Sequence, residues 1–322
     1  VKKDNAFCEI DKEDMHKGNT YKILNIQSDG KILNLTAQLD KNFFDTAEVY
    51  GPFTNEILLG KALAGKRDKV TIATKFGFIF NEAGQTIGAD SRPEHIREVV
   101  NASLKRLNTD YIDLLYQHRV DANVPIEDSV GVMAEFVKAG KVRYLGLCEA
   151  GPNTLRRAMK VHPISALQTE YSLFEMEVEK EILPTCRELG IGFVPYSPLG
   201  RGFITGQVKR AEEYVADDDN RKNFPRFQGE NYERNMQRAA AIKEYAVKRG
   251  LTAGQLAIAW LLDRGPDIVP IPGTKRRTYL RENLASAKVV LTNADRAFLD
   301  KQLPPVSGSR YSEQAMKLID RG

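Results

Sequence analysis

From residue 42 onward, short apolar runs rich in β-branched residues alternate with longer stretches in which apolar residues recur every three or four positions. The short runs predict strands, and the longer stretches predict amphipathic helices. Strands are expected at 42–47, 70–75, 112–118, 142–148, 166–172, 191–197 and 267–273. Helices are expected at 93–107, 126–139, 154–160, 178–189, 252–263 and 277–287.

This alternation indicates βα units around a parallel sheet. The seven strands, with one more upstream, would close a (β/α)8 TIM barrel whose catalytic groups lie at the carboxyl ends of its strands. A Rossmann fold is the main rival, but no G-x-G-x-x-G motif follows any expected strand. The helix at 93–107 has a defined start, because Pro93 occupies its first turn and Ser91 with Glu94 predicts a capping box.

Residues 1–41 depart from this pattern, so we divide the chain into an atypical amino-terminal segment and a barrel domain at 42–322. Residues 20–35 form two apolar runs around Ser28-Asp29-Gly30, which is typical of a hairpin. Residues 36–41 are then too few for a crossover connection. The hairpin replaces part of the barrel wall, or 36–40 continue a stunted helix, or this stretch is not the natural amino terminus of such a protein.

The composition is that of a soluble globular enzyme, with 42% hydrophobic residues and no apolar run of ~18 residues that would span a membrane. The amino-terminal stretch lacks the apolar core of a signal peptide, so a cytoplasmic location is expected. The net charge is only +4 and basic residues are mixed with acidic ones, which argues against a nucleic-acid surface.

The cysteines and histidines give no sign of a metal site. Cys8, Cys148 and Cys186 are odd in number and show no paired spacing, which favours reduced thiols. The four histidines show no paired spacing either, and no H-E-x-x-H motif occurs. We therefore predict no metal.

Four chemically active side chains lie at or just after the ends of expected strands: Asp45, Tyr50, Lys75 and His118. In a barrel these ends converge above one pocket. A phenol flanked by an ammonium and an imidazole is suited to protonating a carbonyl oxygen. Taken singly, each residue is better explained by a structural role: a turn cap for Asp45, a half-buried aromatic for Tyr50, a solvated strand end for Lys75 and a core histidine for His118. Their joint occurrence favours a catalytic set.

The segments FFDTAEVYG, TKFG, YQHR, PYSPLGRG and PIPGTKR occur in an order and at separations that resemble the aldo-keto reductases over residues 42–292. PYSPLGRG and the long insert after it are similar to the bacterial, fungal and plant branch that reduces diverse aldehydes and ketones. The resemblance implies a small-molecule carbonyl substrate, NADPH as the cofactor, and Tyr50 as proton donor. Lys75 would lower the pKa of Tyr50, Asp45 would hold Lys75, and His118 would orient the substrate.

The same resemblance assigns contacts to the nicotinamide half of the cofactor. Gln168 would bind the carboxamide and Tyr196 would stack on the ring. A Ser usually precedes the Asn or Glu at the neighbouring position, whereas this chain has Cys148-Glu149, so a hydroxyl donor becomes a weak thiol donor. The pyrophosphate would be held by Ser197, Leu199 and Arg201.

A second group of cofactor contacts is implied after the last expected strand. Here a helix start with nearby cations predicts an anion site, and the resemblance places the adenosine 2′-phosphate there. Tyr279 stands where many relatives have an arginine, so the positive charge has to come from other residues. The residues of this group are Gly273, Thr274, Lys275, Arg276, Arg281 and Asn283.

The insert at 202–230 is polar and too long for a simple loop, so we interpret it as a disordered lid that folds over the cofactor or as a mobile surface excursion. Two alternatives to a reductase stay open. One is a catalytically weak NADPH-binding sensor or regulatory subunit of the same fold, motivated by the unusual segment 1–41. The other is an unrelated barrel in which Lys75 forms a Schiff base. The sequence predicts no particular natural substrate or oligomeric state.

Overall fold

The computed structural model describes residues 42–214 and 219–320, which form two compact units. The sheet unit comprises described residues 42–169, 181–194 and 318–320, and the helical unit comprises described residues 170–180 and 195–317. The expected hairpin and the other interpretations of residues 1–41 lie outside the described residues. No helix in the described ranges is long and apolar enough to cross a membrane.

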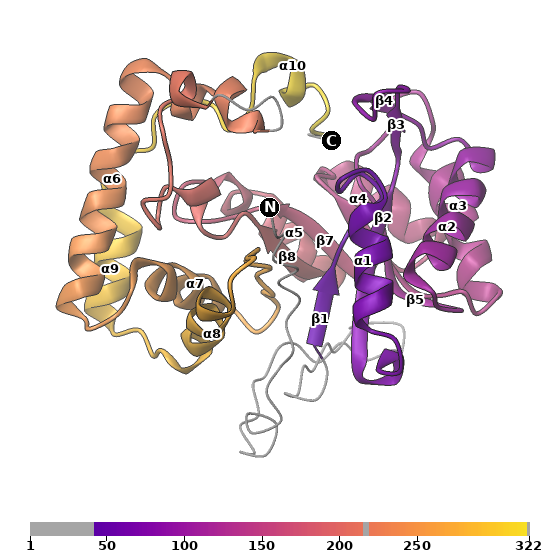
Figure 1. Ribbon diagram of the computed structural model, residues 1–322, viewed down its shortest axis with the longest axis horizontal. Coiled ribbons are helices and arrows are strands. Elements are labelled where there is room, and N and C mark those ends of the chain that lie inside the picture. Colours follow the sequence, from indigo (N-terminus) through magenta and orange to yellow (C-terminus); the bar gives the residue numbers. More distant parts are fainter. Residues whose placement is uncertain (1–41, 215–218, 321–322) are drawn as a thin grey trace, which may run out of the picture. The chain divides into compact units, whose positions relative to one another are not determined.

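A six-stranded sheet with the order β1-β2-β5-β6-β7-β8 forms the centre of the sheet unit (Figure 1). The strand pairings from β1 to β7 are all parallel. The strands β2, β5 and β7 are buried along almost their whole length, as expected where both faces of a parallel sheet are covered. The strands are β1 (Asn42–Asp45), β2 (Val70–Phe76), β5 (Ile112–Gln117), β6 (Val142–Cys148), β7 (Ala166–Glu170) and β8 (Gly192–Tyr196).

The strand expected at 267–273 does not form. Ile268 makes one isolated bridge, and the backbone N–H of Ile271 donates to the carbonyl of Pro195 at 3.2 Å. Pro270 and Pro272 lack the N–H groups that a strand ladder needs, which explains why the pairing stops there. The further strand expected upstream of residue 42 lies outside the described residues.

An antiparallel hairpin that the sequence analysis did not predict follows β2. Its strands are β3 (Phe78–Phe80) and β4 (Thr86–Ala89). The hairpin occupies the connection from β2 to the next helix, so it continues directly from the strand that carries Lys75. This connection lies at the carboxyl end of the strand, which is where barrels carry their functional loops.

Helices connect the strands of the sheet unit. The helix expected at 93–107 forms with those bounds, and Pro93 lies in its first turn as predicted. The predicted capping box is wrong, because Arg92 is the N-cap residue and the Ser91 hydroxyl accepts a hydrogen bond from Gln117 Nε2 at 2.8 Å. The helices and turns are α1 (Thr54–Ala62), η2 (Arg67–Lys69), α2 (Pro93–Leu107), α3 (Ile126–Lys138), α4 (Pro152–Val161) and α5 (Ile182–Leu189).

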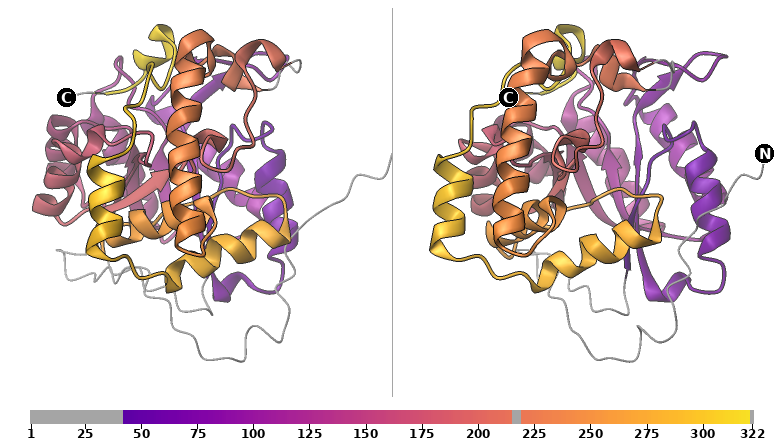
Figure 2. Two further views of the ribbon diagram at one scale, coloured as in Figure 1. Left: turned by 90° about the vertical axis from the view of Figure 1, so that its left-hand side faces the viewer. Right: turned by 60° about the vertical axis from the view of Figure 1, so that its left-hand side comes forward.

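The helical unit is built mainly from helices late in the chain, drawn in orange and yellow in Figure 2. Capping boxes from Thr252 and Thr292 begin two of them, and the fully buried Trp260 donates to Asp300 at 2.7 Å. Its helices are α6 (Gly229–Lys248), α7 (Ala253–Asp263), α8 (Arg277–Ala285), α9 (Asn293–Lys301) and α10 (Glu313–Met316), with short turns η3 (Glu177–Glu179) and η8 (Ser286–Lys288).

The described parts of the insert at 202–230 have defined turns, so the expectation of disorder is wrong for 202–214 and 219–230. Phe227 is fully buried and its ring centroid lies 4.6 Å from that of Phe203. Burial of these rings gives the insert an apolar anchor that its polar composition hides. Its role as a lid stays a prediction. The turns are η4 (Gly200–Gly202), η5 (Ala211–Glu213), η6 (Asn220–Asn223) and η7 (Pro225–Phe227).

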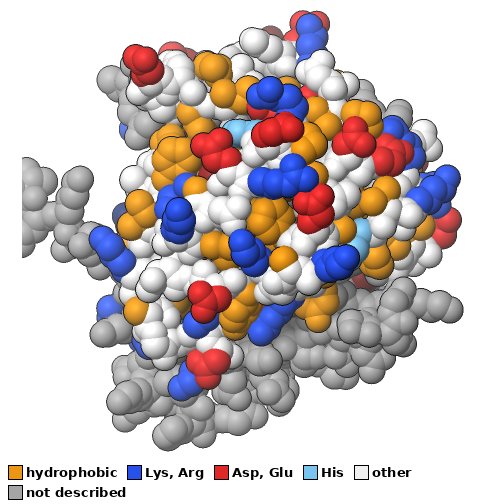
Figure 3. All heavy atoms as spheres, turned by 90° about the vertical axis from the view of Figure 1, so that its right-hand side faces the viewer, with side chains coloured by type: hydrophobic (Ala, Val, Ile, Leu, Met, Phe, Trp, Pro, Cys, Tyr) orange, Lys and Arg blue, Asp and Glu red, His pale blue; other side chains and the backbone are white. Residues whose placement is uncertain are grey.

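Charged side chains of both signs are interspersed on the face shown in Figure 3. In the sheet unit, exposed charged side chains pair across neighbouring helices, as in Arg97 with Glu135 at 3.0 Å and Arg157 with Glu127 at 2.6 Å. Such exposed pairs contribute little to stability. Their mixture of signs is the pattern that the sequence analysis anticipated for this chain.

Candidate active site

Three of the four predicted catalytic residues lie at or just after the carboxyl ends of neighbouring strands. Asp45 ends β1, Lys75 lies near the end of β2, and His118 follows β5. The parallel register pairs Asp45 with Ala73 and Lys75 with Tyr116, so Asp45 and Lys75 lie at the same edge of the sheet. The Lys75 side chain is fully buried, and its ammonium donates to Asp45 Oδ1 and, at 2.8 Å, to the carbonyl of Thr46. A buried ammonium is tolerated only with partners of this kind.

Tyr50 reaches the same ammonium from the turn that follows β1. Its hydroxyl lies 3.4 Å from Lys75 Nζ, and its ring stands edge-on to the His118 ring with centroids 6.2 Å apart. The chain reverses after Tyr50 through Gly51 and Phe53, both of which have positive φ. Phe53 closes the turn by donating its N–H to the carbonyl of Glu48 at 2.7 Å. The turn therefore brings the phenol back over the strand ends.

Gln168 joins this cluster through Asp45. Its Nε2 donates to Asp45 Oδ2 at 2.8 Å, while the other carboxylate oxygen accepts from Lys75. Gln168 lies on β7, where it is the register partner of Cys148. The amide nitrogen that the resemblance assigns to the nicotinamide carboxamide thus donates to the Asp45 carboxylate, and a contact with nicotinamide stays a prediction.

The charge state of Lys75 follows from these contacts. Burial alone would lower the pKa of Lys75, but the Asp45 carboxylate and then Tyr50 outweigh it and raise the pKa above its ordinary value. Lys75 is therefore a stable ammonium. A Schiff base needs a neutral amine, so this environment disfavours the alternative in which Lys75 attacks a carbonyl.

Two opposing effects act on the pKa of Tyr50. Burial of its phenol raises the pKa of Tyr50 above that of a free phenol, although the nearby Lys75 acts in the lowering direction. The lowering effect expected of Lys75 is therefore present, but in the chain by itself desolvation of the phenol outweighs it. At neutral pH the group is a protonated phenol, able to donate.

His118 follows β5 and is held by its backbone N–H, which donates to the carbonyl of Phe76 at 2.8 Å. Burial, the Lys75 ammonium and Arg119 lower the pKa of His118 well below its ordinary value, so the imidazole is neutral. Its Nδ1 is buried without a hydrogen-bond partner among the described residues. The ring lies edge-on to Phe78, with centroids 4.8 Å apart. A neutral imidazole with an unsatisfied nitrogen is suited to binding a polar ligand atom.

Cys148 and Glu149 lie at the end of β6 in the same unit. Burial raises the pKa of Cys148 to about 12, so this residue is a thiol and not a thiolate. Glu149 is buried with a left-handed backbone, and its N–H donates to the carbonyl of Gln168 at 3.0 Å. Asp320 holds the loop after it by accepting from the N–H of Gly151 at 2.9 Å. The two residues are structurally fixed, and their contact with a cofactor stays a prediction.

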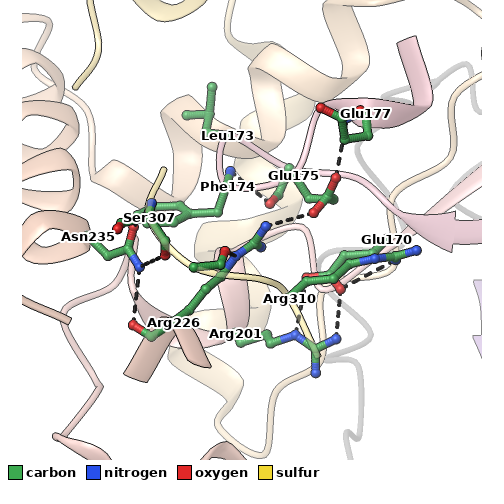
Figure 4. A network of polar contacts seen from close by, with 12 residues as sticks. Glu170, Leu173, Phe174, Glu175, Glu177, Arg201, Arg226, Asn235, Ser307 and Arg310 are labelled. Atoms are coloured by element: carbon green, nitrogen blue, oxygen red, sulfur yellow. Dashed lines mark hydrogen bonds and ion pairs between the residues drawn. The ribbon is translucent and has the colours of Figure 1, made fainter. Parts of the chain in front are cut away.

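The predicted pyrophosphate residues lie in the helical unit, after β8. Ser197 and Arg201 both have positive φ, which produces a tightly folded loop. The Arg201 guanidinium donates to both oxygens of the fully buried Glu170, at 3.1 and 2.7 Å (Figure 4). It also lies over the rings of Phe224 and Tyr311, 4.6 and 4.5 Å from their centroids. The Arg201 side chain is thus paired internally, and a role at a pyrophosphate is left to its backbone or to a rearranged side chain.

Tyr196, the expected nicotinamide platform, ends β8 and shares a hydrogen bond of 2.8 Å between its hydroxyl and that of Tyr311. Arg310 reaches the same hydroxyl at 3.5 Å and lies 3.7 Å from Glu170. The sequence analysis named none of these tail residues, since only their contacts in space mark them. The segment from Pro304 onward therefore lies against the strand ends of the helical unit.

The backbone of this tail is held by buried polar side chains, several of which are labelled in Figure 4. Arg226 donates to the carbonyl of Gly308 at 3.2 Å and pairs with Glu175 at 2.7 Å. Asn235 donates to the carbonyl of Ser307 at 2.8 Å and accepts from its N–H at 3.0 Å. Arg238 donates to the carbonyl of Pro304. These contacts satisfy backbone groups that a strand or helix would otherwise pair.

The second predicted cofactor group surrounds the start of α8, where Thr274, Lys275 and Arg276 are exposed. The Thr274 hydroxyl accepts from the N–H of Arg276 at 3.1 Å, which shapes the turn into the helix. Asn283 is buried farther along the helix, and Arg281 is exposed. Leu199 lies beside Gly254, 3.8 Å from where a side chain at that glycine would begin, and Glu282 of α8 lies 3.4 Å from the same point. The loop after β8 and helix α8 are therefore neighbours in this unit.

The parallel strands, with Asp45, Tyr50, Lys75 and His118 at or just after their carboxyl ends, are typical of a barrel enzyme. Comparison with known proteins identifies the group. The sequence profile of the Aldo/keto reductase family matches residues 15–303, and the chain belongs to this family of oxidoreductases. The resemblance stated from the sequence motifs is thereby confirmed.

Individual relatives agree with the family. "Probable aldo-keto reductase 1" from Glycine max is 48% identical over 272 residues, which cover 84% of this chain and 78% of that protein. Among solved structures, a glycerol dehydrogenase from Gluconobacter oxydans is similar with a TM-score of 0.73 and 32% identity over 80% of each chain. An aldo/keto reductase from Klebsiella pneumoniae, solved with NADP and acetate, has a TM-score of 0.63 and 24% identity, covering 84% of this chain and 83% of that one. The expected (β/α)8 TIM-barrel fold is confirmed.

Proposed function

We propose that the protein is an NADPH-dependent reductase that converts aldehydes or ketones of small molecules to alcohols, with Tyr50 as the proton donor. One observation carries the proposal: the Lys75 ammonium contacts both the Asp45 carboxylate and the Tyr50 hydroxyl, the latter at 3.4 Å. This arrangement is an acid supported by a fixed positive charge. Family membership supports the reaction class.

The residues present fit the proposed cofactor. When bound, NADPH supplies the hydride that reduces the carbonyl carbon. The exposed cations Lys275 and Arg276 next to the start of α8 are suited to the extra phosphate that distinguishes NADPH from NADH. The family relative from Klebsiella pneumoniae was solved with NADP, which supports the same choice.

The chain's own part in the reaction is to bind the carbonyl oxygen and to move one proton. The neutral His118 binds the substrate oxygen and stabilises the negative charge that develops on it. Tyr50 then donates its proton to that oxygen. The resulting phenolate lies beside the Lys75 ammonium, which Asp45 and Gln168 hold in place. The negative charge of the Tyr50 phenolate therefore develops next to the positive charge of Lys75.

A cytosolic location is part of the proposal, because it supplies NADPH and keeps cysteines such as the buried Cys148 reduced. The substrate is a small molecule in this scheme. Neither feature depends on which carbonyl compound is reduced.

The decisive experiment follows the absorbance of NADPH during reduction of a reactive aromatic aldehyde. Tyr50→Phe is expected to lower kcat by about a hundredfold to ten-thousandfold, the range that a positioned general acid contributes. Its dissociation constant for NADPH should stay near that of the wild type. Tyr144→Phe, on β6 away from the cluster, is the matched control and should keep full activity.

Two results would contradict the proposal. Equal turnover by the wild type and Tyr50→Phe would remove Tyr50 as the donor. Tight NADPH binding with no turnover of any carbonyl compound by the wild type would instead favour the sensor or regulatory subunit.

A further inference from the structure

We propose that Glu48 is a positioning residue, whose ionisation state sets the spacing between the Tyr50 turn and the Phe78 wall beside His118. The inference rests on the proposed function. Glu48 lies between Asp45 and Tyr50 in the chain and exposes only 1% of its surface. Buried carboxylic acids are rare unless their oxygens are used, so the contacts of this side chain matter.

The Glu48 side chain holds the start of the β3 hairpin. Its Oε1 accepts from the backbone N–H of Gly77 at 2.9 Å and of Phe78 at 3.2 Å. Gly77 has a φ of 123°, which a residue with a side chain rarely adopts, so the chain turns sharply here. The two hydrogen bonds fix the direction in which Phe78 leaves β2.

Phe78 connects this turn to the proposed substrate pocket. Its ring packs edge-on against His118 at 4.8 Å between centroids, and His118 in turn lies 6.2 Å from the Tyr50 ring. Any shift of the Gly77–Phe78 amides therefore moves an aromatic wall next to the group that binds the carbonyl oxygen.

The backbone of Glu48 holds the other side of the pocket. Its carbonyl accepts from Phe53 N–H at 2.7 Å, which closes the turn that carries Tyr50. Its N–H donates to the carbonyl of Lys75 at 3.3 Å. A further contact joins the Tyr50 turn to the β3 strand of the hairpin, because the rings of Phe53 and Phe80 stand edge-on with centroids 5.4 Å apart. One residue thus ties the proton donor's turn, the strand of Lys75 and the Phe78 hairpin together.

The charges that face Glu48 leave its carboxylate without a counterion. Arg106 of α2 is the nearby cation, but its Nε pairs with Glu56 of α1 at 2.6 Å, and Glu56 also accepts from Thr74 at 2.6 Å. β2 and the residue after it face Glu48 with their backbone, through the Lys75 carbonyl and the Gly77 amide. In the described part of the chain no cation forms an ion pair with Glu48.

Burial in this setting raises the pKa of Glu48 to about 7, against the opposing effect of the amides of Phe78 and Gly77. Near neutrality the carboxyl group therefore gains and loses its proton. The ionised carboxylate is the stronger acceptor for the two amides, since hydrogen bonds to a charged group are roughly twice as strong. Protonation loosens the start of the hairpin, and with it Phe78.

The first test follows the amide of Phe78 itself. Gly-Phe occurs at three places in the chain, Gly77-Phe78, Gly192-Phe193 and Gly202-Phe203. Carbonyl-labelled glycine with amide-nitrogen-labelled phenylalanine therefore selects three NMR resonances in the full-length protein. We expect the Phe78 resonance to titrate with a midpoint near pH 7 in the wild type and to stay flat in Glu48→Gln. Phe193 and Phe203 are internal controls that should not share this midpoint.

The second test measures kcat and KM for the aldehyde across the same pH range. In the wild type KM should rise as pH falls through about 7, whereas Glu48→Gln should give a KM that is about level over that range. Glu48→Asp, too short to reach both amides, should raise KM several-fold at every pH, and Glu135→Gln on the exposed face of α3 is the matched control. A merely structural role would lower the melting temperature without altering the pH profile.

The outcomes separate this inference from the proposed function. A Phe78 amide that does not titrate in the wild type would overturn the positioning role, and so would an unchanged KM profile in Glu48→Gln. Absence of carbonyl reduction by the wild type, with the Phe78 amide still titrating near pH 7, would overturn the proposed function while the link from Glu48 to the hairpin stands.

Discussion

The side chains of Gln168 and Asp45, 123 residues apart in the chain, are joined by a hydrogen bond of 2.8 Å from Nε2 to Oδ2. Asp45 thereby receives Lys75 on one oxygen and Gln168 on the other. An amide on the fifth strand of the sheet thus orients the carboxylate that orients the ammonium. The proposed catalytic cluster consequently depends on β7 as well as on β1, β2 and β5.

Replacing Gln168 by Leu should weaken both stability and turnover. The substitution leaves Asp45 Oδ2 without its donor, and an unsatisfied buried acceptor costs about 1–3 kcal/mol. We expect the free energy of unfolding in urea to fall by about this amount and kcat to fall about tenfold, because Lys75 loses its fixed orientation. Thr169→Val is a matched control on the same strand: the Thr169 hydroxyl is buried without a partner among the described residues, so its removal should be neutral or slightly stabilising. An unaltered kcat in Gln168→Leu would argue against the orienting role.

The lowered pKa of His118 should make stability depend on pH. The unfolded chain binds a proton on this histidine near pH 6.5, whereas the folded chain binds it only at much lower pH. The folded state is therefore favoured above about pH 6.5 and loses this contribution as pH falls. We expect the difference in unfolding free energy between the wild type and His118→Gln to shift against the wild type on acidification from about pH 7.5 to about pH 5. A constant difference over this range would show that His118 titrates normally.

Gly146 on β6 should not tolerate a side chain. A Cβ at this position would lie 2.5 Å from two ring carbons of Tyr116 and 2.9 Å from the carbonyl oxygen of Ala166. Tyr116 is fully buried and cannot move aside, so Gly146→Ala should cost about 1–3 kcal/mol in a denaturant titration. The control is Gly131→Ala in α3, where a Cβ would meet nothing within 4 Å. That change should be neutral or stabilise the protein by up to about 1 kcal/mol, because Ala favours the helix. Equal losses in both variants would contradict the packing argument.

The helix at 93–107 could be predicted from the sequence because Pro93 marks its start and buried apolar residues recur along one face. Helix α1 was missed because Leu59 is its only large apolar residue that is buried, beside Gly60 and the fully buried Glu56, which pairs with Arg106, so apolar periodicity does not reveal the helix. The strand expected at 267–273 does not form because Pro270 and Pro272 lack backbone N–H groups, although the apolar residues around them are typical of a strand.

The candidate site shows the same division. Asp45, Tyr50, Lys75 and His118 could be named because each stands at an expected strand end within a motif. The sequence did not predict the hydrogen bond between Gln168 and Asp45, the internal ion pair of Arg201 or the hydrogen bonds made by the buried Glu48. These features depend on contacts across strands and on burial. The raised pKa of Tyr50 likewise follows from the balance between desolvation and charge, which only coordinates supply.

The attachment of the tail at 304–308 has a consequence for how this chain can diversify. Arg238, Asn235 and Arg226 bind its carbonyl groups and the Ser307 amide N–H, so most of their contacts are with the backbone of the tail. Backbone groups are shared by almost every residue type. New side chains can therefore be tried along the tail while its path is preserved. The contacts that hold the backbone of the tail can stay constant while its side chains change. One fold can in this way acquire new binding preferences without a change in the path of its chain.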